Sequence, residues 1–273
     1  LSFLLTNPKD RSIRTVTRPL VGLSHRLFAE LSSRSRQCLG FFLLTKNRRQ
    51  FAKNCCLTSK LVMRRQHLHL TDLCHDLIKI PDQTGAIEVT GLAVDSKRVA
   101  AGNLFFALVG SHRDGRDFIG DAIKAGAAAI VTGMAPVTKD IAKLTQQAAI
   151  PILQCENPRR IMAKMAAVNW LSQPGMVAAV TGTNGKTSTT EFLRQLWQRA
   201  TWQAIAVGTL GITGTDMIKS DGALLSLPSL TTPDSISLHA TLAPLTKAGV
   251  THLALEASSH GLEQHRLDGL NIH

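Results

Sequence analysis

The hydrophobic and polar positions along the chain follow two different periods, which predict short strands and helices in turn. Short apolar runs that end in polar or glycine-containing turns are typical of buried strands. Such runs predict strands at 88–96, 104–108, 127–131, 150–153, 176–180, 204–207 and 251–255. Apolar residues at every third or fourth position are typical of one helix face. That period predicts helices at 68–78, 118–125, 157–171, 188–200 and 235–245.

Local signals mark the ends of some of these helices. Asn157 stands where an N-cap is expected, Pro158 follows in the first turn, and Gly126 stands directly after a predicted helix end. The alternation of strands and helices predicts an α/β fold with two domains. A small α/β domain is expected over 63–172 and a domain with a mostly parallel sheet over 173–273.

A glycine-containing turn follows the predicted strand at 176–180 and ends in Lys-Thr, where a helical period begins. A strand, such a turn and a helix form a phosphate cradle, because backbone N–H groups and the positive end of the helix dipole face an anion there. Lys186 is expected to supply a point charge, and the Thr187 hydroxyl to reach a Mg²⁺ ion. The residues expected at the nucleotide are Gly182, Thr183, Asn184, Gly185, Lys186, Thr187 and Ser188.

This loop departs from a full Walker A pattern at one position. That pattern has a glycine where this chain has Val180, six residues before Lys186. The match is therefore to the shorter Gly-Thr-Asn-Gly-Lys-Ser/Thr form, which is typical of Mur ligases and folylpolyglutamate synthetases. A chance match is the alternative for the motif alone, and the strand–turn–helix context argues against it.

Glu256 follows the predicted strand at 251–255, at the carboxyl end where open α/β sheets bind ligands. Because a phosphate loop precedes it in the same predicted sheet, we expect Glu256 to bind the Mg²⁺ that neutralises nucleotide phosphates, together with Thr187. Lys186 and Glu256 are thus the expected catalytic residues. The alternative for a single glutamate at a strand end is a solvated side chain.

The net charge of +12 invites the hypothesis of a nucleic-acid-binding protein, but the charge is concentrated in one segment. Residues 1–62 hold 12 Lys and Arg against only Asp10 and Glu30, so they carry +10 of the total. The rest of the chain is nearly neutral and predicts no basic surface for nucleic acid.

The segment 1–62 is expected to be a disordered or poorly packed extension without a role in catalysis. Its bias towards Arg and Ser is typical of a transit peptide. The alternative, which we favour, is upstream sequence translated in frame, with Met63 as the natural first residue.

The five cysteines show no CxxC pair and no metal-ligand spacing, which favours reduced thiols and a cytoplasmic protein. No apolar run approaches the length of roughly 18 residues that a membrane span requires. We therefore expect a soluble protein without a membrane partner, and a monomer.

The predicted first domain resembles the first domain of Mur ligases. The resemblance lies in 95–99, 102–107, Gly110, 114–115 and Phe118. In that family this domain holds the UDP end of the substrate. By position, the resemblance places Val94, Ser96, Ser111, His112 and Arg113 at the uridine. The alternative for Asp95, Ser96 and 114–115 is that they only form turns.

The second half carries two further matches to Mur ligases. Thr231 and Thr232 match paired threonines that contact the precursor in that family, and the alternative is that they cap the next helix, with Pro233 in its first turn. The segment 256–266 resembles the signature of the type that adds the third amino acid of the peptide. That match implies substrate contacts for Ser258, Gln264 and Arg266, with Arg266 pairing with a substrate carboxylate through its planar fork. A hydrolase built on Ser258 and His260 lacks a GxSxG elbow.

The resemblance implies an ATP-dependent amide ligase of peptidoglycan biosynthesis, with ATP and Mg²⁺ as cofactors. Its partners would be UDP-N-acetylmuramoyl-L-alanyl-D-glutamate and an amino acid, either meso-diaminopimelate or L-lysine. The fold implied is a small UDP-binding α/β domain followed by a partial P-loop ATPase domain. The match starts near Met63 and continues to His273, and the family's third domain is not found, so an N-terminal fragment is expected. Two alternatives are a non-catalytic binder of the precursor and a ligase related to folylpolyglutamate synthetase.

Overall fold

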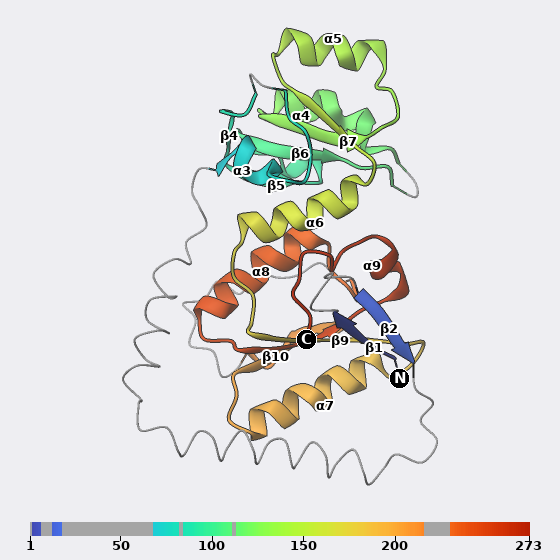
Figure 1. Ribbon diagram of the computed structural model, residues 1–273, viewed down its shortest axis with the longest axis vertical. Coiled ribbons are helices and arrows are strands. Elements are labelled where there is room, and N and C mark those ends of the chain that lie inside the picture. The colour runs from blue at the N-terminus through green and yellow to red at the C-terminus, as the bar shows by residue number, and fades with distance from the viewer. Residues whose placement is uncertain (1, 7–12, 18–67, 82–83, 111–112, 216–229) are drawn as a thin grey trace.

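The computed structural model describes residues 2–6, 13–17, 68–81, 84–110, 113–215 and 230–273. These residues form two larger sheets, one above the other in Figure 1. We call the parts of the chain around these sheets the first and the second domain. The predicted α/β fold is confirmed, while the domain boundaries at 62 and 172 stay a prediction.

The first domain is built on four parallel strands in the order β5-β6-β7-β8. A two-stranded antiparallel ladder of β3 and β4 lies beside them. The strands are β3 (Leu68–His69), β4 (Glu88–Val89), β5 (Gly91–Ala93), β6 (Asn103–Ala107), β7 (Ala129–Gly133) and β8 (Ile152–Cys155). The helices are α3 (Leu70–Cys74), α4 (Ile119–Lys124), α5 (Lys139–Gln147) and α6 (Pro158–Asn169).

Alternate residues of β6 reach separate cores on the two faces of this sheet. Leu104 and Phe106 pack with Met165 of α6, whereas Phe105 packs with Ile119 of α4. This follows from the side-chain period of two in a strand. Because both faces are covered, β6 is apolar along its buried length, which is the pattern of a central parallel strand.

The second domain contains a mixed sheet in the order β11-β10-β12-β9-β1-β2, in which β10, β12 and β9 are parallel. Helices α7 and α8 cover its opposite faces (Figure 1). The strands are β1 (Ser2–Thr6), β2 (Ile13–Thr17), β9 (Met176–Thr181), β10 (Ala204–Gly208), β11 (Gly211–Thr213) and β12 (His252–Glu256). The helices are α7 (Lys186–Arg199), α8 (Ser235–Lys247) and α9 (Ser259–Glu263).

Most predicted elements are present, with shifted ends. The caps expected for α6 are confirmed, because Asn157 Oδ1 accepts the Arg160 N–H at 3.1 Å and Pro158 opens the helix. Gly126 follows α4 with a φ of 92°, as expected for a residue after a helix end. The helix predicted at 68–78 was wrong in its extent, because residues 68–69 pair with β4 and only 70–74 are α-helical.

Two parts of the basic segment 1–62 belong to the described residues. β1 and β2 pair with each other in antiparallel fashion, and β1 also pairs with β9. The remainder of the segment lies outside the described residues, so its expected disorder stays a prediction.

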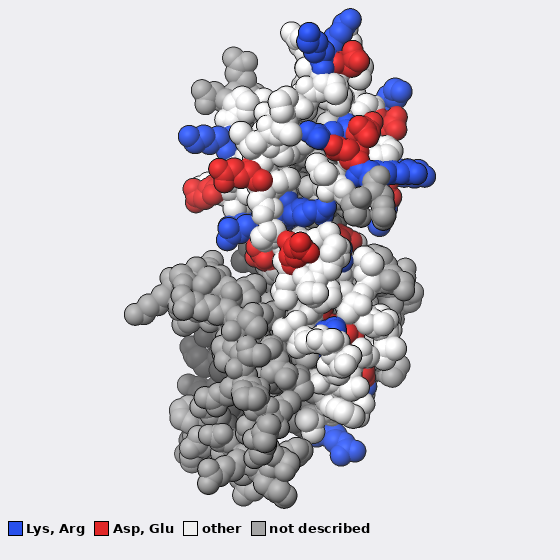
Figure 2. Space-filling model, turned by 90° about the vertical axis from the view of Figure 1, so that its right-hand side faces the viewer, with Lys and Arg blue, Asp and Glu red and all other residues white. Residues whose placement is uncertain are grey.

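Charged side chains of both signs are interspersed on the described surface of the first domain that Figure 2 shows. This part of the surface has no patch of a single sign, which agrees with the near-neutral balance of the chain beyond residue 62. Within the described parts, no helix is long and apolar enough to cross a membrane.

Helix α6 connects the domains, because one side of it covers the first sheet and another packs on α8. His239 of α8 is buried at this junction, 2% exposed, and a Cβ placed on Gly269 would lie only 2.7 Å from its Nε2 atom. Neither ring nitrogen has a hydrogen-bond partner among the described residues. Burial lowers the pKa of His239 from 6.5 to about 4.

We expect this histidine to make stability depend on pH. Because its pKa is lower in the folded chain than in the unfolded chain, its full contribution is present above pH 6.5 and is lost as the pH falls towards about 4. The loss reaches up to about 3 kcal/mol in unfolding free energy. Urea denaturation between these pH values should show this slope, and His239→Leu should lack it. If the unfolding free energy of His239→Leu changed with pH as much as that of the original chain, another group would be responsible. The control is His75→Leu, which changes an exposed histidine and should keep the pH dependence.

Candidate functional site

The phosphate loop lies between β9 and α7 and depends on two glycines. Gly182 has a φ of 145° and Gly185 a φ of 80°, a region that residues with a side chain rarely adopt. Gly185 is also the N-cap residue of α7, and its left-handed conformation turns the chain into the helix. Lys186 therefore begins the helix, two residues earlier than the sequence predicted.

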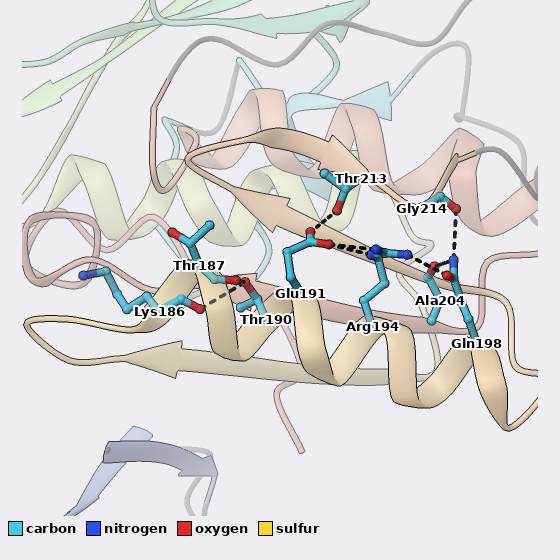
Figure 3. Close-up of polar contacts among 9 residues, drawn as sticks. All are labelled: Lys186, Thr187, Thr190, Glu191, Arg194, Gln198, Ala204, Thr213 and Gly214. Carbon is cyan, nitrogen blue, oxygen red and sulfur yellow. Dashed lines mark hydrogen bonds and ion pairs between the residues drawn. The ribbon is translucent and has the colours of Figure 1, made fainter.

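Lys186 is held at the mouth of this loop. Its Nζ donates to the carbonyl oxygen of Gly182 at 2.7 Å and to that of Thr183 at 3.4 Å. Thr187 lies beside it in the first turn of α7 (Figure 3), and its hydroxyl makes no hydrogen bond to another described residue. The lysine thus has only neutral acceptors in the described part of the chain, so its charge is available to an anion.

Glu256 lies at the same edge of the sheet as the loop. It pairs in register with Val180, the residue before the last of β9, and its side chain is 1% exposed. Its carboxylate accepts the Thr209 N–H at 2.9 Å and the Thr209 hydroxyl at 3.3 Å. A Cβ placed on Gly208 would lie 2.1 Å from the carboxylate, so only glycine fits beside it.

These contacts test whether Glu256 suits a divalent cation. Among the described residues it forms no ion pair, so a buried carboxylate has two neutral donors from Thr209 and no counter-charge. Such a group is costly unless a cation compensates it. Carboxylate and hydroxyl oxygens are ligands that Mg²⁺ accepts. Glu256 and Thr187 therefore fit the metal role predicted from the sequence.

A polar network holds α7 against β10 and β11 (Figure 3). Arg194 donates to Glu191 at 2.8 Å and to Gln198 at 2.6 Å. Glu191 also accepts the hydroxyl of Thr213 in β11, and Gln198 donates to the Ala204 carbonyl at 2.9 Å. The network fixes the helix that carries Lys186 to the strands that flank Thr209.

The paired threonines serve the structure around Glu256. The hydroxyl oxygens of Thr231 and Thr209 lie 3.2 Å apart, within hydrogen-bond distance. Thr232 is buried and donates to the Glu256 carbonyl at 2.9 Å, and the Ser258 N–H donates to Thr232 Oγ1 at 2.9 Å. Their predicted contact with a substrate stays a prediction.

The alternative that the threonines cap α8 was wrong. The cap is Asp234, whose Oδ1 accepts the Ser237 N–H at 2.9 Å, so Pro233 lies before the cap rather than in the first turn. Ser258 itself caps α9 by accepting the Gly261 N–H at 3.0 Å.

Gln264 and Arg266 lie next to this cluster. The Arg266 guanidinium donates to the Thr232 carbonyl at 2.6 Å and to Gln264 Oε1 at 2.9 Å. Burial lowers the pKa of Arg266, and Asp234 opposes that effect. The residues predicted from the second half of the chain, Thr231, Thr232, Glu256, Ser258, Gln264 and Arg266, are thus connected to one another through these contacts.

The residues predicted at the uridine lie around a separate pocket in the first domain. Val94, Ser96 and Arg113 line this pocket of about 350 Å³. Ser111 and His112 lie outside the described residues. The turn-forming role is confirmed for Asp95, which caps the 3-10 helix at Ser96–Arg98.

Asp114 also forms a turn, since it caps the next 3-10 helix at Gly115–Phe118. It binds the Arg116 guanidinium at 2.6 Å, and the hydrogen bond from Arg116 lowers the pKa of Asp114. Gly115, the first residue of this 3-10 helix, lies in the lining of the pocket.

Two models of one protein family match consecutive parts of the chain. The Mur ligase family, catalytic domain, matches residues 88–170, and the Mur ligase middle domain matches residues 180–273. Together they include both the pocket of the first domain and the phosphate loop. The chain belongs to the Mur ligase family.

Curated Mur ligases are similar over most of the chain and agree with the type predicted from 256–266. The UDP-N-acetylmuramoyl-L-alanyl-D-glutamate--2,6-diaminopimelate ligase of Bradyrhizobium diazoefficiens is 44% identical over 205 residues, covering 75% of this chain and 39% of that protein. The ligase of the same name from Brucella melitensis is 45% identical over 192 residues, covering 70% of this chain and 36% of that protein. The chain spans about two fifths of the length of these relatives or less.

One solved Mur ligase structure supports the fold. It is titled as a UDP-N-acetylmuramoyl-L-alanyl-D-glutamate--2,6-diaminopimelate ligase and superimposes with a TM-score of 0.59 at 27% sequence identity. The superposition covers 76% of this chain and 39% of that structure.

The network of Figure 3 predicts a stability effect near the loop of this Mur ligase chain. Glu191→Gln removes the counter-charge of Arg194, whose side chain is only 14% exposed. We expect the unfolding free energy in urea to fall by about 1–3 kcal/mol. Glu191→Gln combined with Arg194→Gln should recover part of that loss, since no unpaired charge remains. A single variant as stable as the original chain would contradict the role of the pair.

Proposed function

We propose that the chain contains the precursor-binding and ATP-binding parts of a ligase of peptidoglycan biosynthesis. The intact reaction joins the third amino acid, meso-diaminopimelate or L-lysine, to UDP-N-acetylmuramoyl-L-alanyl-D-glutamate at the expense of ATP. The observation that carries this proposal is the pairing of Glu256 with Val180, because it brings a buried carboxylate to the phosphate loop. The names of the curated relatives support the choice of substrate.

The residues of the loop have distinct roles in this proposal. The Thr183, Asn184 and Gly185 backbone faces the nucleotide phosphates, and Lys186 exchanges its carbonyl acceptors for phosphate oxygens. Thr187 and Glu256 hold Mg²⁺, which when bound supplies a counter-charge for the phosphates. Neither Lys186 nor Glu256 acts as a nucleophile, because phosphoryl transfer requires positioning and charge stabilisation.

Different parts of the chain bind different parts of the precursor in this proposal. The uridine binds in the pocket of Val94, Ser96 and Arg113. Ser111 and His112, which lie outside the described residues, are proposed to contact it on the family resemblance alone. The peptide part lies at Thr231, Thr232, Ser258, Gln264 and Arg266. The carboxylate of the precursor receives the γ-phosphoryl group of ATP, and ADP leaves. The amine of the incoming amino acid then attacks the carbonyl carbon of the acyl phosphate, so that an amide bond forms and inorganic phosphate and a proton are released.

A non-catalytic precursor binder is the second candidate. Measurement of ADP formation with the precursor and diaminopimelate separates the two. A ligase related to folylpolyglutamate synthetase shares the phosphate loop, but the family match at 88–170 disfavours it. A cytoplasmic location and a monomeric state stay predictions, and the free Cys74 and Cys155 agree with a reducing compartment.

We expect Lys186→Ala to abolish binding of ATP while UDP binding is retained, because the lysine charge serves only the phosphate loop. Titration with a fluorescent ATP analogue and with UDP measures both affinities on the same chain. Lys247→Ala, at the exposed end of α8, is the matched control. Unchanged ATP affinity in Lys186→Ala would refute the assignment of the loop.

Glu256→Gln should separate metal binding from folding. The amide keeps an acceptor for the Thr209 N–H and loses the negative charge, so the fold should persist while Mg²⁺ no longer increases ATP affinity. ATP titrations with and without Mg²⁺ measure that difference. A Mg²⁺ effect equal to that of the original chain would exclude Glu256 as a ligand.

A further inference from the structure

Two arginines from different domains share one neutral acceptor at the junction of the domains. Arg159 lies in the first turn of α6, and Arg266 follows α9. Nη1 of Arg159 donates to Gln264 Oε1 at 3.4 Å, and Nη2 of Arg266 donates to the same oxygen at 2.9 Å. Two positive charges are thus held around one amide oxygen.

The other acceptors of the two guanidinium groups are neutral as well. Arg159 Nη2 donates to the Val109 carbonyl at 2.6 Å, and Arg266 Nη1 donates to the Thr232 carbonyl at 2.6 Å. Neither arginine forms an ion pair with any residue that the structure describes. Each guanidinium has five N–H donors, so donors remain on both.

This arrangement is unfavourable for the chain alone. Burial lowers the pKa of Arg159, and the positive charge of Arg266 lowers it further. The charge of Asp234 acts in favour of the charged form of Arg266, but Asp234 forms no ion pair with either arginine among the described residues. Two like charges therefore remain close together in a partly buried site, and a bound anion would relieve their repulsion. The pair therefore has the electrostatics of an anion site.

The position of Arg159 relates the pair to both parts of the proposed substrate site. Val109 lies two residues before the segment 111–113, which is expected at the uridine, while Gln264 and Thr232 belong to the proposed peptide part. Arg159 thus lies between the two regions that the precursor is proposed to span.

Contacts between the domains hold the segment of Gln264 in place. His265 has a φ of 56°, and its Nε2 atom accepts the Asn157 amide at 2.8 Å while its Nδ1–H donates to Asp268 at 3.0 Å. The direction at Asn157 follows because its Oδ1 already accepts a backbone N–H of α6. Gln264 and Arg266, on either side of His265, are thereby oriented by the helix that carries Arg159.

We propose that Arg159 joins Arg266, for which a substrate carboxylate is already expected, and that the two bind the carboxylate of the precursor's D-glutamate that is not activated. This inference rests on the proposed function. Terminal glutamate has two carboxylates, of which one must remain nucleophilic towards ATP, so two guanidinium groups suit the other one. Planar guanidinium forks match a carboxylate in two-point contacts.

The test compares two ligands on variants of the chain. Calorimetric titration measures the affinity for UDP-N-acetylmuramoyl-L-alanyl-D-glutamate and for the analogue whose non-reacting glutamate carboxylate is a primary amide. Arg159→Gln should lower the affinity for the precursor by about 10- to 100-fold and leave the affinity for the analogue nearly unchanged. The affinity of Arg159→Lys for the precursor should lie between those of the original chain and Arg159→Gln, because lysine keeps the positive charge but lacks the planar guanidinium fork. Lys164→Gln, a cation of α6 outside the pair, is the control.

The outcomes separate this inference from the proposed function. Two results would refute the carboxylate site and leave the ligase assignment standing, provided that the original chain binds the precursor. In one, Arg159→Gln binds the precursor as tightly as the original chain does. In the other, Arg159→Gln loses the same affinity for the precursor and for the analogue. If the original chain binds neither the precursor nor UDP, the proposed function fails. Thermal unfolding of each variant without ligand shows whether a loss of affinity comes from misfolding. If Arg159→Gln is misfolded, the affinities of Arg159→Lys for the two ligands decide whether the carboxylate site exists.

Discussion

The parallel pairing of β12 with β9 is the constraint on which the rest of the site depends. It sets Glu256 level with Val180, and the Ala257 N–H continues the ladder by donating to the Val180 carbonyl at 2.8 Å. Since side chains alternate between the faces of a sheet, a shift of one residue would turn Glu256 to the other face. The apolar residues Leu253 and Leu255, both fully buried, oppose such a shift, because it would remove them from the core cluster in which they pack. Hydrophobic burial in the core therefore sets the geometry of a polar site at its edge.

The carboxylate of Glu256 extends this constraint to neighbouring segments. It holds Thr209, Thr209 contacts Thr231, and the next residue, Thr232, binds back to the Glu256 main chain. On the other side of the site, Glu191 connects α7 to β11, directly after the turn that contains Thr209. The loop helix and the acidic strand end are thus held by separate networks that meet at the turn between β10 and β11. A cation between them would act on groups whose positions are already fixed, so little ordering would accompany its binding.

Patterns that are local in the sequence could be predicted, and contacts between distant residues could not. The loop at 182–187 and Glu256 at a strand end follow from apolar runs and glycines that lie close together in the chain. Helix α5 was missed because it is mostly polar and only Thr145 among its residues is buried. The short β11 and α9 are defined by their partners rather than by a period of their own. Thr209 was not among the predicted site residues, although its place after the strand beside β12 was a usable signal. The contact of Arg159 with Gln264 joins residues 105 positions apart, and no pattern within either segment indicates it.

The junction of the domains shows why such a contact matters for the substrate site. A left-handed residue other than glycine costs of order 1–3 kcal/mol and persists only where its surroundings hold it. His265 is such a residue, and its ring is held by Asn157 of the first domain and by Asp268. Arg160 also reaches Asp268, at 3.3 Å. Because the backbone at His265 sets the directions of Gln264 and Arg266, the arrangement of these two side chains depends on α6 being in place. The first domain therefore shapes the part of the candidate site that the second domain carries.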